Sequence, residues 1–181
     1  FAVDRAPSQL CWLDTRTGEV SPLTDGPHTD ERPAVTPDGR TVVFVSNRSG
    51  RLNLWRIDAD GAGLAQLTDG PGPDYRPCVS PDGRLLAYFT SAPDGSHQVR
   101  LRELSSGKEP PTDWTGRFAW SHGPYWCADG RALLVHALAR GATAPALWRV
   151  DLASGEVQRV DSPALACASH GTLDAAGRWL V

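Results

Sequence analysis

The chain has 181 residues, of which 40% are hydrophobic, and its 18 Lys and Arg against 21 Asp and Glu give a net charge of −3. This length and apolar content suit one packed domain, which we expect to span residues 1–181. The near-neutral charge and the scattered basic residues argue against a nucleic-acid partner. No apolar run approaches the roughly 18 residues of a membrane span, so membrane insertion is not expected.

The sequence begins at Phe1 and contains no Met. We therefore expect a processed chain or an excised piece of a longer protein. No signal peptide is recognisable in it, and the compartment stays open on composition alone. Four cysteines, at positions 11, 78, 127 and 167, form no CxxC pair, which favours small buried side chains on strands without a disulfide.

Taken in chain order, short apolar runs separated by turn residues predict strands rather than helices. After a first run that ends at Asp14, the stretch Arg32–Asp58 reads RPAVTPDGRTVVFVSNRSGRLNLWRID. Its Pro-Asp-Gly fixes a tight turn, because Pro sets φ, Asp bonds its own backbone and Gly accepts a positive φ. The flanking runs of Val, Leu and Phe are typical of strands.

This unit recurs about every 45 residues, which is the period of a propeller blade. The turn glycine returns, each time followed by Arg, at Gly39, Gly83, Gly130 and Gly177. Four short strands in each unit predict an all-β fold, a β-propeller whose four-stranded blades pack face to face. We place the blade repeats at about residues 31–74, 75–121 and 122–169, with a split blade at 1–30 plus 170–181.

About four blade equivalents fit in the chain, and two ways of closing it stay open. Written end to end, the C-terminal GRWLV and the N-terminal FAVDR parallel GRTVVFVSNR of the first complete repeat. This continuity fits a closed four-bladed ring. A segment of a larger propeller whose ends fall in phase fits it as well, and agrees with a chain that lacks Met.

The stretch Pro33–Gly70 resembles the blade repeat of TolB-type propellers, a PD40-like and WD40-like repeat family. The similar features are the Pro-Asp-Gly turn, the Ser-Asn-Arg loop, the Asp-Ala-Asp-Gly turn and the Leu-Thr ending. Related blades occur in prolyl-oligopeptidase propellers and in oligogalacturonate lyases. The resemblance covers essentially the whole chain, although the turns CADGR (127–131) and DAAGR (174–178) lack the Pro. It implies the fold and suggests a periplasmic or extracellular location, but the matched turn and core residues do not imply a function.

In a propeller, the residues that precede each innermost strand face one end of the central channel, where ligands bind. Here they are Glu31, Arg32, Tyr75, Arg76, His122 and His170. We expect a polar funnel in which the two guanidinium groups grip a carboxylate. The acidic residues at hand to balance those charges are Asp30, Glu31 and Asp74. The competing interpretation is that the Arg-Pro pairs belong to the repeat and form structural salt bridges.

The function that the sequence favours is a non-catalytic binding module for a protein partner or for a small anionic or carbohydrate ligand. No GxSxG, Walker or GxGxxG motif is present, so neither catalysis nor a cofactor is expected within this chain. One alternative is a metal-dependent enzyme of the carbohydrate-lyase kind, with a divalent metal held in the channel by His28, His122 and His170. Another is the propeller part of a larger serine peptidase whose catalytic domain lies elsewhere.

Overall fold

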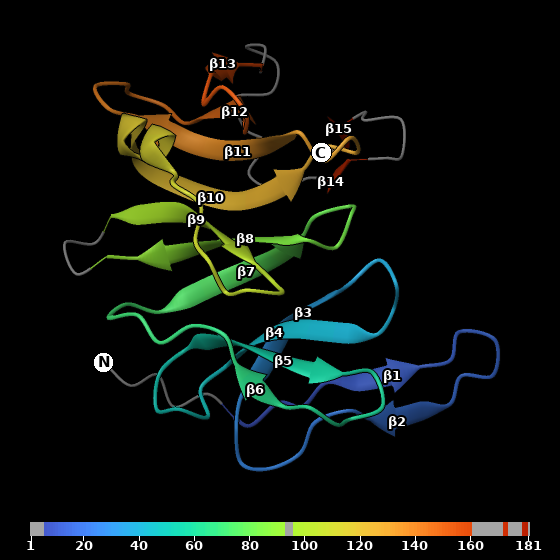
Figure 1. The fold of residues 1–181 in the computed structure, drawn as a ribbon. Coiled ribbons are helices and arrows are strands. Elements are labelled where there is room, and N and C mark those ends of the chain that lie inside the picture. The colour runs from blue at the N-terminus through green and yellow to red at the C-terminus, as the bar shows by residue number, and fades with distance from the viewer. Residues whose placement is uncertain (1–5, 93–95, 161–171, 174–178, 181) are drawn as a thin grey trace. The chain divides into compact units, whose positions relative to one another are not determined.

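In a computed structural model, residues 6–92, 96–160, 172–173 and 179–180 are described, and the chain divides into two compact units, Phe1–Pro77 and Cys78–Val181. Antiparallel strands make up almost all of the regular structure, which confirms the all-β prediction (Figure 1). The helix in these residues is one short 3₁₀ helix, η1 (Asp113–Arg117). A helix long and apolar enough to cross a bilayer does not occur in the described part of the chain.

The first unit holds a two-stranded and a four-stranded sheet. β1 (Cys11–Leu13) pairs with β2 (Val20–Pro22). The larger sheet has the order β3 (Asp30–Val35), β4 (Thr41–Ser46), β5 (Asn53–Asp58) and β6 (Ala65–Gln66). Val42 and Phe44 of β4 pack with Leu10 and Ile57 in a buried cluster. The long Val and Phe run that predicts this strand therefore forms the centre of the unit.

The second unit repeats this pattern (Figure 1). β7 (Asp74–Val79), which begins at the end of the first unit, forms a sheet with β8 (Leu85–Ser91) and β9 (His97–Glu103). A four-stranded sheet follows, made of β10 (Phe118–Trp126), β11 (Ala132–Ala139), β12 (Ala146–Asp151) and β13 (Val157–Arg159). β14 (Thr172–Leu173) pairs with β15 (Trp179–Leu180). The buried core of this unit joins apolar side chains of β8, β9, β10, β11 and β12 with Trp114 of η1.

The Asp-Gly-Arg turns join the first and second strands of three successive sheets. Gly39, Gly83 and Gly130 have φ of 71°, 73° and 67°, and each amide donates a hydrogen bond of 2.8 to 2.9 Å to the carbonyl three residues earlier. A residue with a Cβ would be strained at such a φ, which explains why glycine recurs here. The predicted turn is confirmed at these three glycines, while Gly177 lies outside the described residues.

The second sheet differs from the predicted four strands. Among the described residues it contains three strands, whereas the sheets before and after it contain four. The chain that follows β9 carries Pro110 and Pro111, which have no amide hydrogen to donate to a ladder, and then turns into η1. The number of blades, the closure of the chain into a ring, the single domain over 1–181 and the repeat boundaries stay predictions.

The expectation that the cysteines are buried is wrong for Cys11. This residue is an exposed free thiol on β1, whereas Cys78 and Cys127 are free and half-buried. Side chains alternate between the faces of a strand, and β1 turns Trp12 towards the core and Cys11 towards the surface. Burial raises the pKa of the Cys78 thiol, and it also raises the pKa of the Cys127 thiol. Cys167 lies outside the described residues.

Candidate functional site

The residues predicted to line the funnel include three that share an unusual backbone conformation. Arg32 on β3, Arg76 on β7 and Gly123 on β10 have φ of 56°, 51° and 53°. They occupy the same place in successive sheets, and each is followed by proline. The equivalence that the sequence predicts for these three positions therefore holds in the backbone.

In β3 and in β10 the left-handed residue lies at a β-bulge. The pairing of β3 with β4 shifts between Glu31 and Ala34, and the pairing of β10 with β11 shifts between His122 and Pro124. A bulge re-aims the side chains beside it and bends the strand. Proline contributes because it supplies no amide hydrogen to the interrupted ladder.

The backbone does not need arginine at these positions. Arg32 and Arg76 are the two non-glycine residues with positive φ in the described chain, and such a conformation costs on the order of 1 kcal/mol or more for a residue with a Cβ. Gly123 adopts the same conformation without that cost. The two arginines therefore add strain that a glycine at the same position would not add.

The side chain of Arg32 is 44% exposed, and its Nε lies 3.6 Å from Oε1 of Glu31. A pair of this length with an exposed arginine contributes little to stability, so the guanidinium of Arg32 stays available to a ligand. Tyr75 and Arg76 are half-buried on β7, and both are engaged in interactions within the protein. The residues expected in the first two repeats, Glu31 and Arg32 on β3 and Tyr75 and Arg76 on β7, thus lie in the first half of their strands, which we call the strand entries. Of the two arginines, Arg32 is the more exposed.

Of the three predicted channel histidines, only His28 is described in full. His122 lies on β10 opposite His136 of β11, but its side chain lies outside the described part, as does the whole of His170. His28 is half-buried, and its carbonyl accepts a hydrogen bond from the amide of Ser8. Within the described residues no three His, Cys, Asp or Glu side chains gather as metal ligands would. The metal alternative, which needs His122 and His170, stays a prediction.

Asp30 does not contribute a free charge to the funnel. Its carboxylate is buried and accepts hydrogen bonds from Ser46 Oγ at 2.6 Å and from Arg48 Nη2 at 2.7 Å. Asp74, at the equivalent place in the second sheet, is buried too. The sequence shows these aspartates close to the arginines. Only the fold reveals that the buried carboxylate of Asp30 anchors the start of β3 through Ser46 and Arg48.

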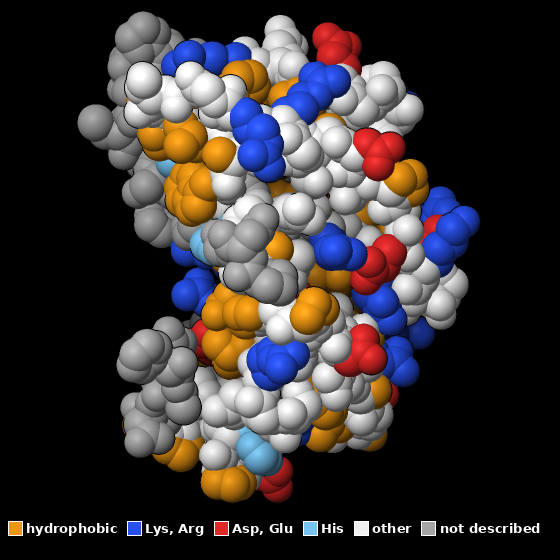
Figure 2. Space-filling model, turned by 90° about the vertical axis from the view of Figure 1, so that its left-hand side faces the viewer, with side chains coloured by type: hydrophobic (Ala, Val, Ile, Leu, Met, Phe, Trp, Pro, Cys, Tyr) orange, Lys and Arg blue, Asp and Glu red, His pale blue; other side chains and the backbone are white. Residues whose placement is uncertain are grey.

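Basic, acidic and apolar side chains are interspersed on the face of the molecule that Figure 2 shows. This mixture agrees with the net charge of −3. On this face the charge is therefore local, carried by individual side chains rather than by one extended field of a single sign.

Residues 2–169 match the family model described as the TolB beta propeller domain, PD40. Because this match covers most of the chain, the protein belongs to the TolB β-propeller family. The resemblance of the Pro33–Gly70 stretch to TolB-type blades is confirmed.

Three comparisons define how far the similarity reaches. TolB from Acinetobacter baumannii superimposes with a TM-score of 0.78 at 22% identity, over 93% of this chain and 41% of that one. A structure from a study of two prolyl endopeptidases gives a TM-score of 0.62 at 19% identity, over 88% of this chain and 27% of that one. The uncharacterized protein Atu1656 of Agrobacterium fabrum (strain C58) is 35% identical over 52 residues, 29% of this chain and 18% of that protein. The chain spans less than half the length of each, and the structural similarities show the fold alone.

Proposed function

We propose that this propeller is a non-catalytic binding module that presents its strand entries to a protein partner or to a small anionic or carbohydrate ligand. The residues that would form the site are Glu31, Arg32, Tyr75, Arg76, His122 and His170. The observation that carries the proposal is the left-handed backbone of Arg32 and Arg76, at a position where the third repeat has Gly123.

Strained positions of this kind cluster at functional sites, because selection keeps the residue for its chemistry rather than for stability. The guanidinium group is planar and always charged, and it binds carboxylates through two parallel hydrogen bonds. Two such groups at equivalent strand entries suit a ligand that carries more than one carboxylate, such as an acidic oligosaccharide or an acidic peptide segment.

The competing explanation is that the arginines only stabilise the repeat. The one ion pair of Arg32 in the described residues joins its exposed side chain to the half-buried Glu31 over 3.6 Å, and such long pairs near the surface contribute about 0 to 1 kcal/mol. That gain does not exceed the strain at the same residue. For Arg32 the balance supports a binding role, and neither the lyase nor the peptidase alternative gains a specific observation of its own.

The proposal is tested by isothermal titration of trigalacturonate and of an acidic peptide into the wild type and into the double variant Arg32→Gln/Arg76→Gln. We expect the variant to lose at least about tenfold in affinity, the equivalent of roughly 1.4 kcal/mol, since each lost pair is a charge-assisted hydrogen bond.

The matched control is Arg40→Gln/Arg84→Gln, which removes the same charge from exposed arginines that follow the turn glycines. The control should bind like the wild type. Equal losses in the two double variants would show that only net charge matters. Wild-type affinity in Arg32→Gln/Arg76→Gln would remove the strand entries as the site.

A further inference from the structure

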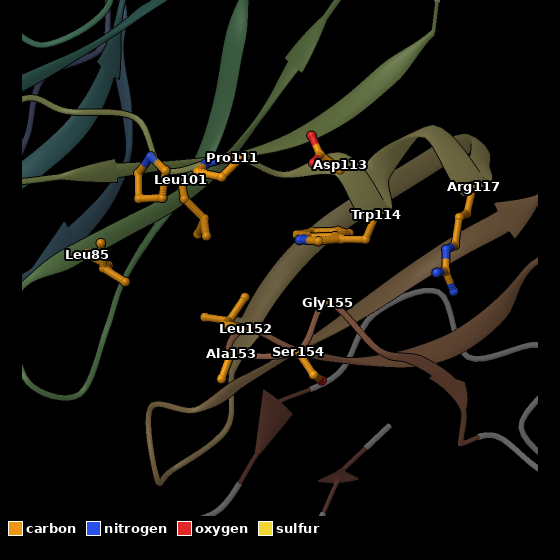
Figure 3. A pocket seen from close by; sticks show the side chains of 11 residues that line it. Leu85, Leu101, Pro111, Asp113, Trp114, Arg117, Leu152, Ala153, Ser154 and Gly155 are labelled. Atoms are coloured by element: carbon orange, nitrogen blue, oxygen red, sulfur yellow. The ribbon is translucent and has the colours of Figure 1, made fainter.

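A cavity of about 530 Å³ lies in the second unit, between the sheet of β7 to β9 and the sheet of β10 to β13 (Figure 3). Its volume falls within the roughly 300 to 1,000 Å³ of typical small-molecule sites. The wall residues that matter here are Leu85 and Leu101 of β8 and β9, Trp114 and Arg117 of η1, and Leu152 and Ala153 of the turn after β12.

The cavity lies beside the sheet of β7 to β9, which has no fourth strand among the described residues. Pro110 and Pro111, which also line it, cannot donate to a ladder on the outer edge of β9. The chain instead continues into η1, whose five residues lie beside the start of β10 (Figure 1). The space between the two sheets is therefore left open towards the outside.

The cavity wall combines polar and apolar surface in similar shares, and its apolar part is built by four core side chains. Leu101 and Trp114 belong to the buried core of the unit, and Leu85 and Leu152 pack against that core. The indole of Trp114 is 6% exposed and extends across the cavity from η1 (Figure 3). A flat aromatic wall beside branched aliphatic side chains suits the hydrocarbon or aromatic part of a ligand.

Among the described residues, one cation at the rim of the cavity has no partner. In the described chain, the guanidinium of Arg117 makes neither a hydrogen bond nor an ion pair, and the residue is exposed. Its neighbour Arg140, by contrast, is engaged, because its Nε donates to the carbonyl of Gly116 at 2.8 Å. Asp113, the other charged residue of the lining, starts from the opposite end of η1, with Trp114 between the two (Figure 3).

We propose that this cavity binds a small apolar monocarboxylate. The apolar body of the ligand lies against Trp114, Leu101 and Leu152, and its carboxylate pairs with Arg117. Asp113 repels a second negative charge at the other end of η1, so a monoanion is favoured over a dianion. This site is separate from the strand entries and does not depend on the function proposed for them.

The test uses 4-phenylbutyrate and its uncharged analogue 4-phenylbutyramide, titrated into the full chain and followed by calorimetry or NMR. The wild type should bind the acid at least about tenfold more tightly than the amide, because a hydrogen bond to a charged group exceeds a neutral one by roughly that factor. Arg117→Gln should abolish this preference and leave the affinity for the amide unchanged.

Two further variants locate the binding. Arg131→Gln changes an exposed arginine of the same unit that does not line the cavity, and it should keep the preference for the acid. Ala153→Phe, on the exposed turn, should fill the cavity and weaken both probes while circular dichroism stays that of the wild type. Equal binding of acid and amide to the wild type, an undiminished preference in Arg117→Gln, or no saturable binding by the folded wild type would each overturn the proposal.

Discussion

The carboxylate of Asp30 is fully buried against the guanidinium of Arg48, with 2.7 Å between Oδ2 and Nη2. The Oγ of Ser46 donates to the other carboxylate oxygen at 2.6 Å. Arg48 also lies over the rings of Phe44 and Trp55, at 5.4 and 5.3 Å from their centroids. This network holds the first residue of β3, and the bulge that carries Arg32 begins directly after it.

Removing the cation from this pair should be strongly destabilising. We expect Arg48→Gln to lower the free energy of unfolding by about 3 kcal/mol, because it leaves a buried carboxylate without its counter-charge. The double variant Asp30→Asn/Arg48→Gln should lose less than the sum of the two single losses. Urea unfolding of the four proteins measures this coupling, and additive losses would contradict it.

The Asp-Gly-Arg turns predict a dependence of stability on pH. A hydroxyl two residues earlier in the chain donates to Asp38 and to Asp82 at 2.6 Å. This hydrogen bond is the main reason why the pKa of each carboxyl lies below its usual value. A second, smaller cause is the hydrogen bond from the backbone amide of Arg40 or Arg84. The unfolded chain, with the higher pKa near 4, therefore takes up protons first as the pH falls.

The contribution of these turns is thus present above about pH 4 and is lost as the pH falls through the lowered pKa of the folded state. We expect Asp38→Asn/Asp82→Asn to flatten the fall in unfolding free energy between about pH 4 and pH 2. The effect is small, since both carboxylates are exposed. Urea unfolding across this range checks it, and the same pH profile as the wild type would contradict it.

The third turn lacks the hydroxyl that the first two contain. The side chains of Thr36 and Ser80 donate to the turn aspartate and accept the amide of the residue that begins the next strand. Cys127 occupies the same position. Cys127→Ser should raise the free energy of unfolding by about 0.5 to 1 kcal/mol through these bonds. Cys127→Ala is the control, and equal stability of the two variants would refute the expected gain.

Trp114 of η1 and Trp120 of β10 should differ in how much each contributes to the free energy of unfolding. Trp114 is buried in the core of the second unit, whereas Trp120 is half-buried and meets His136 edge to face at 5.8 Å. Trp114→Ala should cost about 3 to 5 kcal/mol, and Trp120→Ala clearly less. Thermal unfolding of both variants decides the order, and equal losses would show that η1 does not anchor the core.

The turns and strands were predictable because their chemistry is local. Pro-Asp-Gly specifies its own conformation, and Gly39, Gly83 and Gly130 all adopt it. The place of η1 was not predicted: the repeat indicated a fourth strand after β9, although Pro110 and Pro111 argue against a strand there. What the sequence could not show is whether the chain after them would continue in an extended form or turn into a helix, because contacts of Trp114 with distant strands decide that.

At the candidate site, too, local features were predictable and contacts between distant residues were not. Aligning Arg32, Arg76 and Gly123 already indicates one structural position, and the glycine is a signal that this position has a positive φ. The pairing of Asp30 with Arg48 was not predictable, because it joins residues 18 apart across a sheet. The acidic residues beside the arginines were expected to balance their charge. The carboxylate of Asp30 is instead buried against Arg48.

The most direct test of the account replaces both strained arginines with the residue that the third repeat uses. Arg32→Gly/Arg76→Gly removes the guanidinium groups and relieves a strain of about 1 kcal/mol or more at each site. We predict that relief of this strain offsets the lost interactions of the two side chains, so the free energy of unfolding in urea equals or exceeds that of the wild type. The affinity of this variant for the acidic probes falls at least about tenfold. A loss of stability with unchanged affinity would show that the arginines serve the fold, and would contradict a binding site at the strand entries.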